Sequence, residues 1–216
     1  MKHVSPNDVA AEVRTKGPTR RALAKQQTRS KVLAAARRLF SEHGYEGATI
    51  RDIAAAAGMS TGAVFANFSD KADLFHAIMT VDMERLTAEM REAAARARNI
   101  EEALLKVFVA GYAFYGAQLP LARAAFSVSW SPAEGEPFRK LDAVSAVQTV
   151  LLEHLNAAVE RGELCQEAEV KLRAQMLFDA YASNFTFAIF QGWTQDALSA
   201  RARDQIRILL AGARRR

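Results

Sequence analysis

Apolar side chains recur every three or four residues through most of the chain, which is the spacing of helices that bury one face. The first such stripe ends in Leu39 and Phe40, and Gly44 is expected to stop that helix. No segment alternates between apolar and polar residues as a half-buried strand does. We therefore predict an all-α fold of about nine helices. Beyond residue 68 the helices are expected at about 69–98, 101–115, 120–130, 138–162, 167–191 and 194–213.

Two short helical patterns joined by a glycine turn follow the first helix. Thr49 can cap the first of them, with Asp52 three residues later as in a capping box. Gly58 ends that helix, because glycine tolerates a left-handed backbone. Ser60 caps the second helix, which we predict over residues 61–68. This arrangement is typical of a helix-turn-helix unit, whose second helix enters the DNA major groove.

The formal net charge of +5 comes entirely from the N-terminal third of the chain. Residues 1–70 carry 11 Lys and Arg against 6 Asp and Glu, whereas residues 71–216 carry 18 of each. Basic charge beside a helix-turn-helix pattern would neutralise phosphates and release counterions. The charge alone is equally compatible with a solvated basic surface.

Residues 28–75 resemble, in order and spacing, the TetR family of bacterial one-component repressors, which are similar to the tetracycline repressor. This resemblance implies a homodimeric repressor that binds a near-palindromic DNA operator and is released by a small organic effector. Two positions depart from the family pattern: Phe65 stands where Tyr is usual, and Asn67 where His or Tyr is usual. The resemblance is carried by Thr28, Arg29, Ala36, Leu39, Phe40, Gly44, Tyr45, Thr49, Ile53, Ala54, Ala57, Gly58, Ser60, Gly62, Phe68, Lys71, Leu74 and Phe75.

With this resemblance the chain divides into three expected parts. Residues 1–24 form a basic flexible arm, which becomes helical somewhere past Thr19. Residues 25–72 form the helix-turn-helix DNA-binding domain. Residues 73–216 form a larger helical domain for ligand binding and dimerisation.

The predicted DNA contacts lie on and around the second short helix. Thr61 or Ala63 can touch a thymine methyl group, while Thr49, Arg51 and Lys71 are expected to contact phosphates. Phe65 cannot donate a hydroxyl hydrogen bond to phosphate. The full predicted set is Arg29, Thr49, Arg51, Ser60, Thr61, Gly62, Ala63, Phe65, Asn67 and Lys71.

The resemblance also implies a ligand cavity among the later helices, although most of their aromatic residues can equally well fill a core. Acids and bases are scarce along these apolar stretches, which favours a neutral or weakly polar organic effector. The candidate ligand contacts are Met79, Met83, Phe108, Tyr112, Tyr115, Phe126, Gln148 and Asn184.

The last two predicted helices carry more apolar residues than a thin core requires. Two such helices from each chain would form a four-helix bundle with a self-complementary interface. We therefore expect a homodimer formed mainly by residues 167–191 and 194–213. The apolar residues that suggest it include Phe187, Phe190, Trp193, Ile206 and Leu209.

Two other classes of function remain open at this point. One is a DNA-binding protein of the same fold that has no small-molecule ligand. The other is a small serine hydrolase, because residues 58–62 (Gly-Met-Ser-Thr-Gly) fit the pattern of a nucleophile elbow. That elbow needs a strand before the serine, whereas an alanine-rich helix is predicted there, and no His or Asp stands in an arguable partner position.

Metal, cofactor and membrane sites are not predicted. The four His show no metal spacing, the single Cys165 cannot form an internal disulfide, and no glycine-rich phosphate loop is present. The longest charge-free runs, residues 107–122 and 180–195, are too short and mixed for a membrane span. The N-terminus lacks the apolar stretch of a signal peptide, so a cytoplasmic location is expected.

Overall fold

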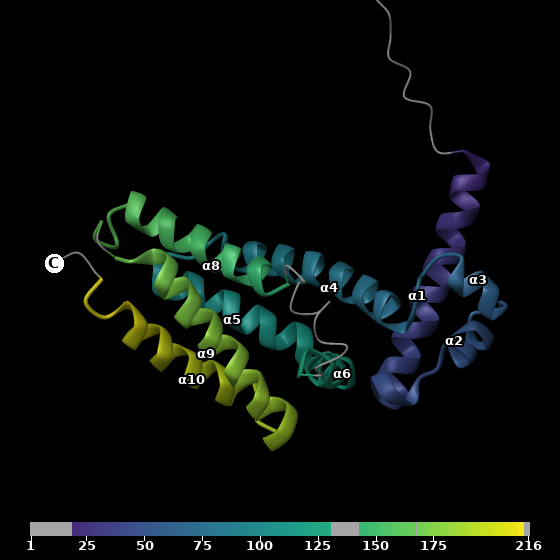
Figure 1. Cartoon of the computed structure of the whole chain (residues 1–216). Helices are drawn as coiled ribbons and strands as arrows, with labels where there is room; N and C mark the ends of the chain where they lie inside the picture. The colour runs from purple at the N-terminus through teal and green to yellow at the C-terminus, as the bar shows by residue number, and fades with distance from the viewer. Residues whose placement is uncertain (1–18, 131–142, 167, 214–216) are drawn as a thin grey trace, which may run out of the picture.

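The computed structural model describes residues 19–130, 143–166 and 168–213, with side chains for all of these except 126–130 and 143–145. Every regular element within these ranges is a helix, which confirms the predicted all-α class. Figure 1 shows a small group, α1–α3, at one end of an elongated helical body, with α4 running from one to the other. The nine described helices are α1 (Arg20–Gly47), α2 (Ile50–Ala56), α3 (Thr61–Phe65), α4 (Lys71–Ala94), α5 (Ile100–Gly116), α6 (Leu119–Trp130), α8 (Ala143–Glu160), α9 (Val170–Gln191) and α10 (Gln195–Leu210).

The first helix begins at Arg20, which agrees with the expected change to helix past Thr19. The hydroxyl oxygen of Thr19 accepts a hydrogen bond from the backbone N–H of Ala22, so the helix is capped there and residues 20–24 are helical. The remainder of the expected arm lies outside the described residues. Near its other end α1 is interrupted at Gly44, whose φ of 72° is left-handed. The predicted break at this glycine is therefore confirmed, although three further helical residues follow it.

Two other helices end sooner than their apolar patterns predicted. Helix α3 stops at Phe65 instead of residue 68, because the side-chain amide of Asn67 donates to the carbonyl oxygen of Ala63 at 2.9 Å. That bond competes with continuation of the helix. Helix α4 stops at Ala94 instead of residue 98, and a turn follows in which the N–H of Ala97 donates to the carbonyl oxygen of Ala94 at 3.0 Å. Asn99 then caps α5 by accepting from the N–H of Glu102 at 2.9 Å.

The described helices bury two hydrophobic clusters. The first joins α1–α3 to the start of α4 and includes Phe40, Tyr45 and Phe75, whose ring centroids lie 5.0–5.6 Å apart. Leu121 and Ala124 of α6 also belong to it, so α6 packs on the N-terminal group. The second cluster lies among the rest of α4 and helices α5, α8, α9 and α10.

An ion pair between a half-buried arginine and a fully buried aspartate also joins the N-terminal group to the body. Arg37 of α1 donates from Nη2 to Oδ1 of Asp82 on α4, and from Nη1 to Oε1 of Gln118 at 2.8 Å. The Asp82 side chain is fully buried, and its Oδ2 has no hydrogen-bond partner among the described residues. The charged form of Asp82 is therefore stable in this position only while Arg37 is paired with it, because burying an unpaired charge costs free energy.

The described residues contain no candidate metal centre and no single membrane-spanning helix. Three or more His, Cys, Asp or Glu side chains do not cluster there in a way that would hold a metal ion. No one helix among them has the length and apolar character to cross a membrane. Helix α5 and the start of α6 are together long and apolar enough, but the chain bends by 99° between them.

Candidate nucleic-acid interface

Local capping fixes the two short helices that form the candidate interface. The hydroxyl of Thr49 accepts from the N–H of Asp52 at 3.2 Å and donates to its carboxylate at 2.5 Å. Gly58 adopts a φ of 68° in the turn between the helices, which a residue with a side chain rarely does. The Oγ of Ser60 then accepts from the N–H of Ala63 at 3.2 Å. All three predicted turn and cap residues are confirmed in these structural roles.

Helix α3 has one buried and one exposed face. Val64, together with Phe68 just beyond the helix, packs into the first cluster. The opposite face presents Thr61, Gly62, Phe65 and Ala66, and the Phe65 side chain is 54% exposed. The N-terminal group therefore holds α3 by its inner side and leaves its outer side open (Figure 1).

Thr49 and Arg51 lie at the start of α2, the helix that packs against α3. Both residues are exposed. The guanidinium of Arg51 forms no hydrogen bond or ion pair within the described part of the chain. Its cation is therefore available to a partner, as expected of a phosphate contact.

Two other predicted DNA contacts are engaged within the protein. Arg29 donates from Nη1 to the carbonyl oxygen of Asn67 at 3.2 Å and stacks over the Phe68 ring at 4.3 Å. Lys71 donates to the carbonyl oxygen of Tyr45 at 3.1 Å and lies 4.2 Å from the centroid of that ring. These cations brace α1 against the residues that follow α3 and against the start of α4.

Asn67 and Ala63 do not lie on the open face of α3. The Asn67 amide nitrogen bonds to Ala63, and its Oδ1 is buried without a partner among the described residues. Both side chains are half-buried. Asn67 therefore serves to end the helix, and the outer face consists of residues 61, 62, 65 and 66.

The nucleophile-elbow pattern at residues 58–62 has a different structural context. Helix α2, and not a strand, precedes the turn. The Ser60 hydroxyl oxygen is occupied as the cap of α3. This arrangement lacks the strand–turn–helix geometry on which such a nucleophile depends.

The candidate ligand residues divide into a central group and outliers. Phe108, Tyr112 and Tyr115 of α5 meet Tyr181 and Phe185 of α9, with ring centroids 5.1–6.1 Å apart. Burial raises the pKa of each of the three tyrosines, so the phenols stay neutral. The Tyr181 hydroxyl is buried without a partner among the described residues. We name these five residues the aromatic cluster.

Asn184 joins the aromatic cluster through a polar network that sequence patterns did not predict. Its amide nitrogen donates to the hydroxyl of Tyr112 and to Oε1 of Gln205, both at 2.8 Å. Its Oδ1 accepts from Nε of Arg201 at 3.0 Å. Arg201 and Gln205 lie one turn apart on α10, and that spacing is the only sequence signal they offered.

Three other candidates lie outside the aromatic cluster. Met83 packs against the second cluster from its edge, whereas Met79 belongs to the first cluster. Gln148 bonds to Gln175 at 2.7 Å and lines a hollow of about 230 Å³ between α8 and α9. The Phe126 side chain lies outside the described residues.

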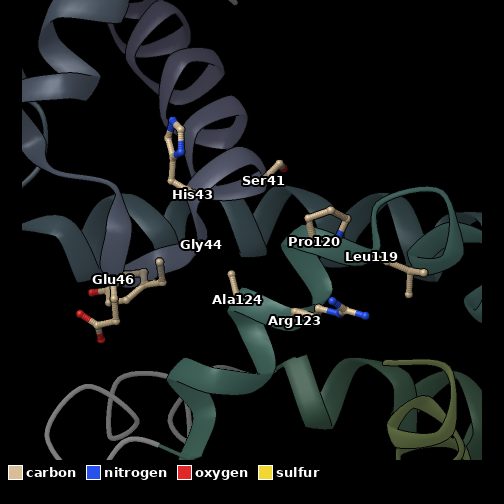
Figure 2. Close-up of a pocket in the computed structure, with 9 residues that line it drawn as sticks. Ser41, His43, Gly44, Glu46, Leu119, Pro120, Arg123 and Ala124 are labelled. Carbon is tan, nitrogen blue, oxygen red and sulfur yellow. The ribbon is translucent and has the colours of Figure 1, made fainter. Parts of the chain in front are cut away.

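A second hollow, of about 560 Å³, lies where the end of α1 meets the start of α6. Figure 2 shows that the side chains of His43 and Glu46 point in different directions around it. Arg123 turns away to donate to the carbonyl oxygen of Ile189 at 2.9 Å. Because these polar groups do not converge, the hollow is a surface groove between helices and not a built ligand site.

Comparison with known proteins agrees with this geometry. A family profile described as "Bacterial regulatory proteins, tetR family" matches residues 32–78, which run from within α1 through α2 and α3 to the first part of α4. The HTH-type transcriptional repressor AcnR of Corynebacterium glutamicum is 46% identical over 65 residues, or 30% of this chain and 35% of that protein. The HTH-type transcriptional regulator UidR of Escherichia coli strain K12 is 39% identical over 67 residues, or 31% of this chain and 34% of that protein.

The matched segment thus spans about a third of the length of these curated relatives. A solved transcriptional regulator from Rhodococcus sp. Rha1 extends the likeness to the whole fold, with a TM-score of 0.69 and 27% identity. That alignment covers 86% of this chain and 97% of the Rhodococcus chain. The profile and the N-terminal relatives assign residues 32–78 to the TetR family of bacterial regulatory proteins, and the solved Rhodococcus regulator shares the fold of the chain as a whole.

Proposed function

We propose that the protein is a homodimeric, ligand-responsive transcriptional repressor that binds a near-palindromic DNA operator. The observation that carries this proposal is the open face of α3, held outward by a capped α2, a glycine turn and a buried inner face. A helix presented this way fits the major groove. The same segment matches relatives that are named repressors. Selection from a random duplex library tests the proposal, and recovery of an inverted repeat is expected.

Phosphate contact by Arg51 should make binding depend on salt. Arg51→Ala should weaken binding to operator and unrelated DNA alike, since phosphates carry no sequence information. The slope of log affinity against log salt should flatten by about one for each Arg51 in the dimer. Fluorescence anisotropy across a salt series measures both effects. The control is Arg96→Ala, another exposed arginine, which lies between α4 and α5. An altered base preference with an unchanged slope would contradict the phosphate assignment.

Close approach to DNA gives a reason for Gly62, which the fold itself does not require. Its φ is not left-handed, and a Cβ there would meet nothing closer than Ser60 Oγ at 3.8 Å. Gly62→Ala should therefore raise the free energy of unfolding by about 0.5–1 kcal/mol, because glycine weakens a helix. Operator affinity should fall in the same variant. Gly116→Ala, in equally open space at the end of α5, should leave DNA binding unchanged. Unchanged operator affinity in Gly62→Ala would show that this position does not face the bases.

Helix α9 carries an exposed apolar face through which two copies of the chain could pair. Leu172, Met176 and Phe190 are exposed on α9. Met176 follows Leu172 by four residues and Phe190 follows Met176 by fourteen, which places all three on one side of the helix. Ile208 is exposed on α10. Ile206, which the apolar pattern assigned to the interface, is instead fully buried within its own chain because it packs into the second cluster.

Charge placed on that face should separate the proposed dimer. Leu172→Glu combined with Met176→Glu should convert a dimer into a monomer at micromolar concentration, since the two copies together would bury four carboxylates against apolar surface. Light scattering gives the mass, and circular dichroism checks that the helices persist. Val81→Glu, at an exposed apolar position on α4, is the control. A monomeric wild-type protein would contradict the proposal.

The effector response rests on the aromatic cluster and its connection to α4. A molecule entering between α5 and α9 would have to displace Tyr181, whose buried hydroxyl has no partner among the described residues. Tyr115 packs against both hydrophobic clusters and lies close enough to Asp82 to interact with its charge. A shift of the aromatic cluster would therefore displace side chains near Asp82 and α1. Only an effector with different affinities for the DNA-bound and released states can weaken binding. The neutral phenols favour a neutral or weakly polar compound.

A further inference from the structure

The open face of α3 is unusual for a surface that would read DNA, because its side chains carry neither charge nor amide groups. It consists of Thr61, Gly62, Phe65 and Ala66. Recognition of guanine generally uses Arg or Lys, and recognition of adenine uses Asn or Gln. The only outward hydrogen-bonding side chain on this face is the Thr61 hydroxyl. The rest of the face is the Phe65 ring, the threonine and alanine methyl groups, and the open space above Gly62.

Three polar side chains near this face are already committed within the protein. The Asn67 amide bonds to Ala63, and the Arg29 guanidinium bonds to the Asn67 carbonyl and stacks on Phe68. Lys71 bonds to Tyr45. Using any of them to read a base edge would break contacts that end α3 or hold it in place.

The major groove offers one apolar group for such a face to recognise. Among the four bases only thymine carries a methyl group there, and apolar side chains contact it. Gly62 lets the helix backbone approach, and Phe65, with over half of its side chain exposed, gains most from being covered. We propose that the protein identifies its operator by packing thymine methyl groups against Phe65 and Thr61, and not by a bidentate hydrogen bond from α3. This inference rests on the proposed repressor function.

The size of the effect follows from the burial of a single carbon. One buried methyl group is worth about 0.8 kcal/mol, which corresponds to about a fourfold change in affinity. A dimer makes the same contact in both half-sites, so removal of both methyl groups should weaken binding about fifteenfold. Exchange of thymine for deoxyuridine removes the methyl group alone and keeps every hydrogen-bonding group of the base pair.

The experiment uses the full-length protein and a duplex selected from a random library. Each thymine of the half-site is replaced in turn by deoxyuridine, symmetrically in both half-sites, and the dissociation constant is measured at fixed salt. A loss of about fifteenfold is expected at one or two positions. Phe65→Ala should abolish that thymine preference at one position without changing the salt slope, whereas Val81→Ala should retain it.

The outcomes separate this inference from the function on which it rests. If the library yields no preferred duplex, the repressor function itself fails. If a preferred duplex is found but no deoxyuridine exchange weakens binding, thymine readout is overturned and the repressor function stands. The same holds if Phe65→Ala leaves the thymine preference intact. The exchange on unaltered protein decides the matter even if the Phe65 variant folds poorly.

Discussion

Replacing Arg37 by alanine should strongly lower the free energy of unfolding. The change leaves the buried Asp82 carboxylate, already short of one partner, with no cation opposite it. Breaking a buried ion pair from one side costs about 3–5 kcal/mol, because the remaining charge is neither hydrated nor paired. The free energy of unfolding from urea titration should fall by that amount.

Two companion variants make this prediction specific. Arg38→Ala removes the neighbouring arginine of α1, which is exposed, and should change stability by less than about 0.5 kcal/mol. Asp82→Leu combined with Arg37→Ala removes both charges and should recover most of the loss. Equal stability of Arg37→Ala and Arg38→Ala would mean that Asp82 is not buried as a charged group. The outcome matters for function, because this pair joins α1 of the candidate DNA-binding group to α4 of the body.

Enlarging Gly111 should also be strongly destabilising. A Cβ at this position of α5 would lie 2.1 Å from the Tyr181 hydroxyl oxygen and 2.7 Å from the Met90 methyl carbon. Tyr181 cannot move aside easily, since Phe108, Tyr112 and Phe185 surround its ring. Overpacking of this kind costs about 1–3 kcal/mol. Gly111→Ala should therefore lower the free energy of unfolding by about that much.

The matched control for Gly111 lies on the same helix. Gly116 has nothing within 4 Å of an added Cβ, so Gly116→Ala should be neutral or slightly stabilising. Thermal unfolding of the two variants side by side measures the difference. Similar melting temperatures would contradict the tight contact between α5 and α9. Gly111→Ala combined with Tyr181→Phe should regain part of the loss, since the clashing oxygen is removed.

The helix-turn-helix could be predicted from sequence because its signals are local. The caps Thr49 and Ser60 and the turn residue Gly58 act on backbone groups within three residues of themselves. Apolar spacing likewise predicted the order of the later helices. Boundaries were less predictable where a side chain competes with the backbone, as Asn67 does at the end of α3.

Contacts between distant segments could not be predicted from one sequence. Arg37 and Asp82 are separated by 45 positions, and Asn184 and Arg201 by 17. Nothing in their local spacing distinguishes them from solvated surface residues. Lys71 and Arg29 were predicted as DNA contacts for their charge, whereas their bonds to Tyr45 and Asn67 depend on how α1, α3 and α4 pack together. Composition suggested the aromatic cluster, but packing alone selects its five members.

One binding measurement tests the central claim most directly. The dissociation constant of the full-length protein is measured for a selected inverted-repeat duplex and for a scrambled duplex of equal length and composition, at physiological salt. We predict that the selected duplex binds at least about 1,000-fold more tightly, with one dimer per inverted repeat. Equal affinity for the two duplexes, or no binding to either, would contradict the account of α3 as a DNA-reading helix.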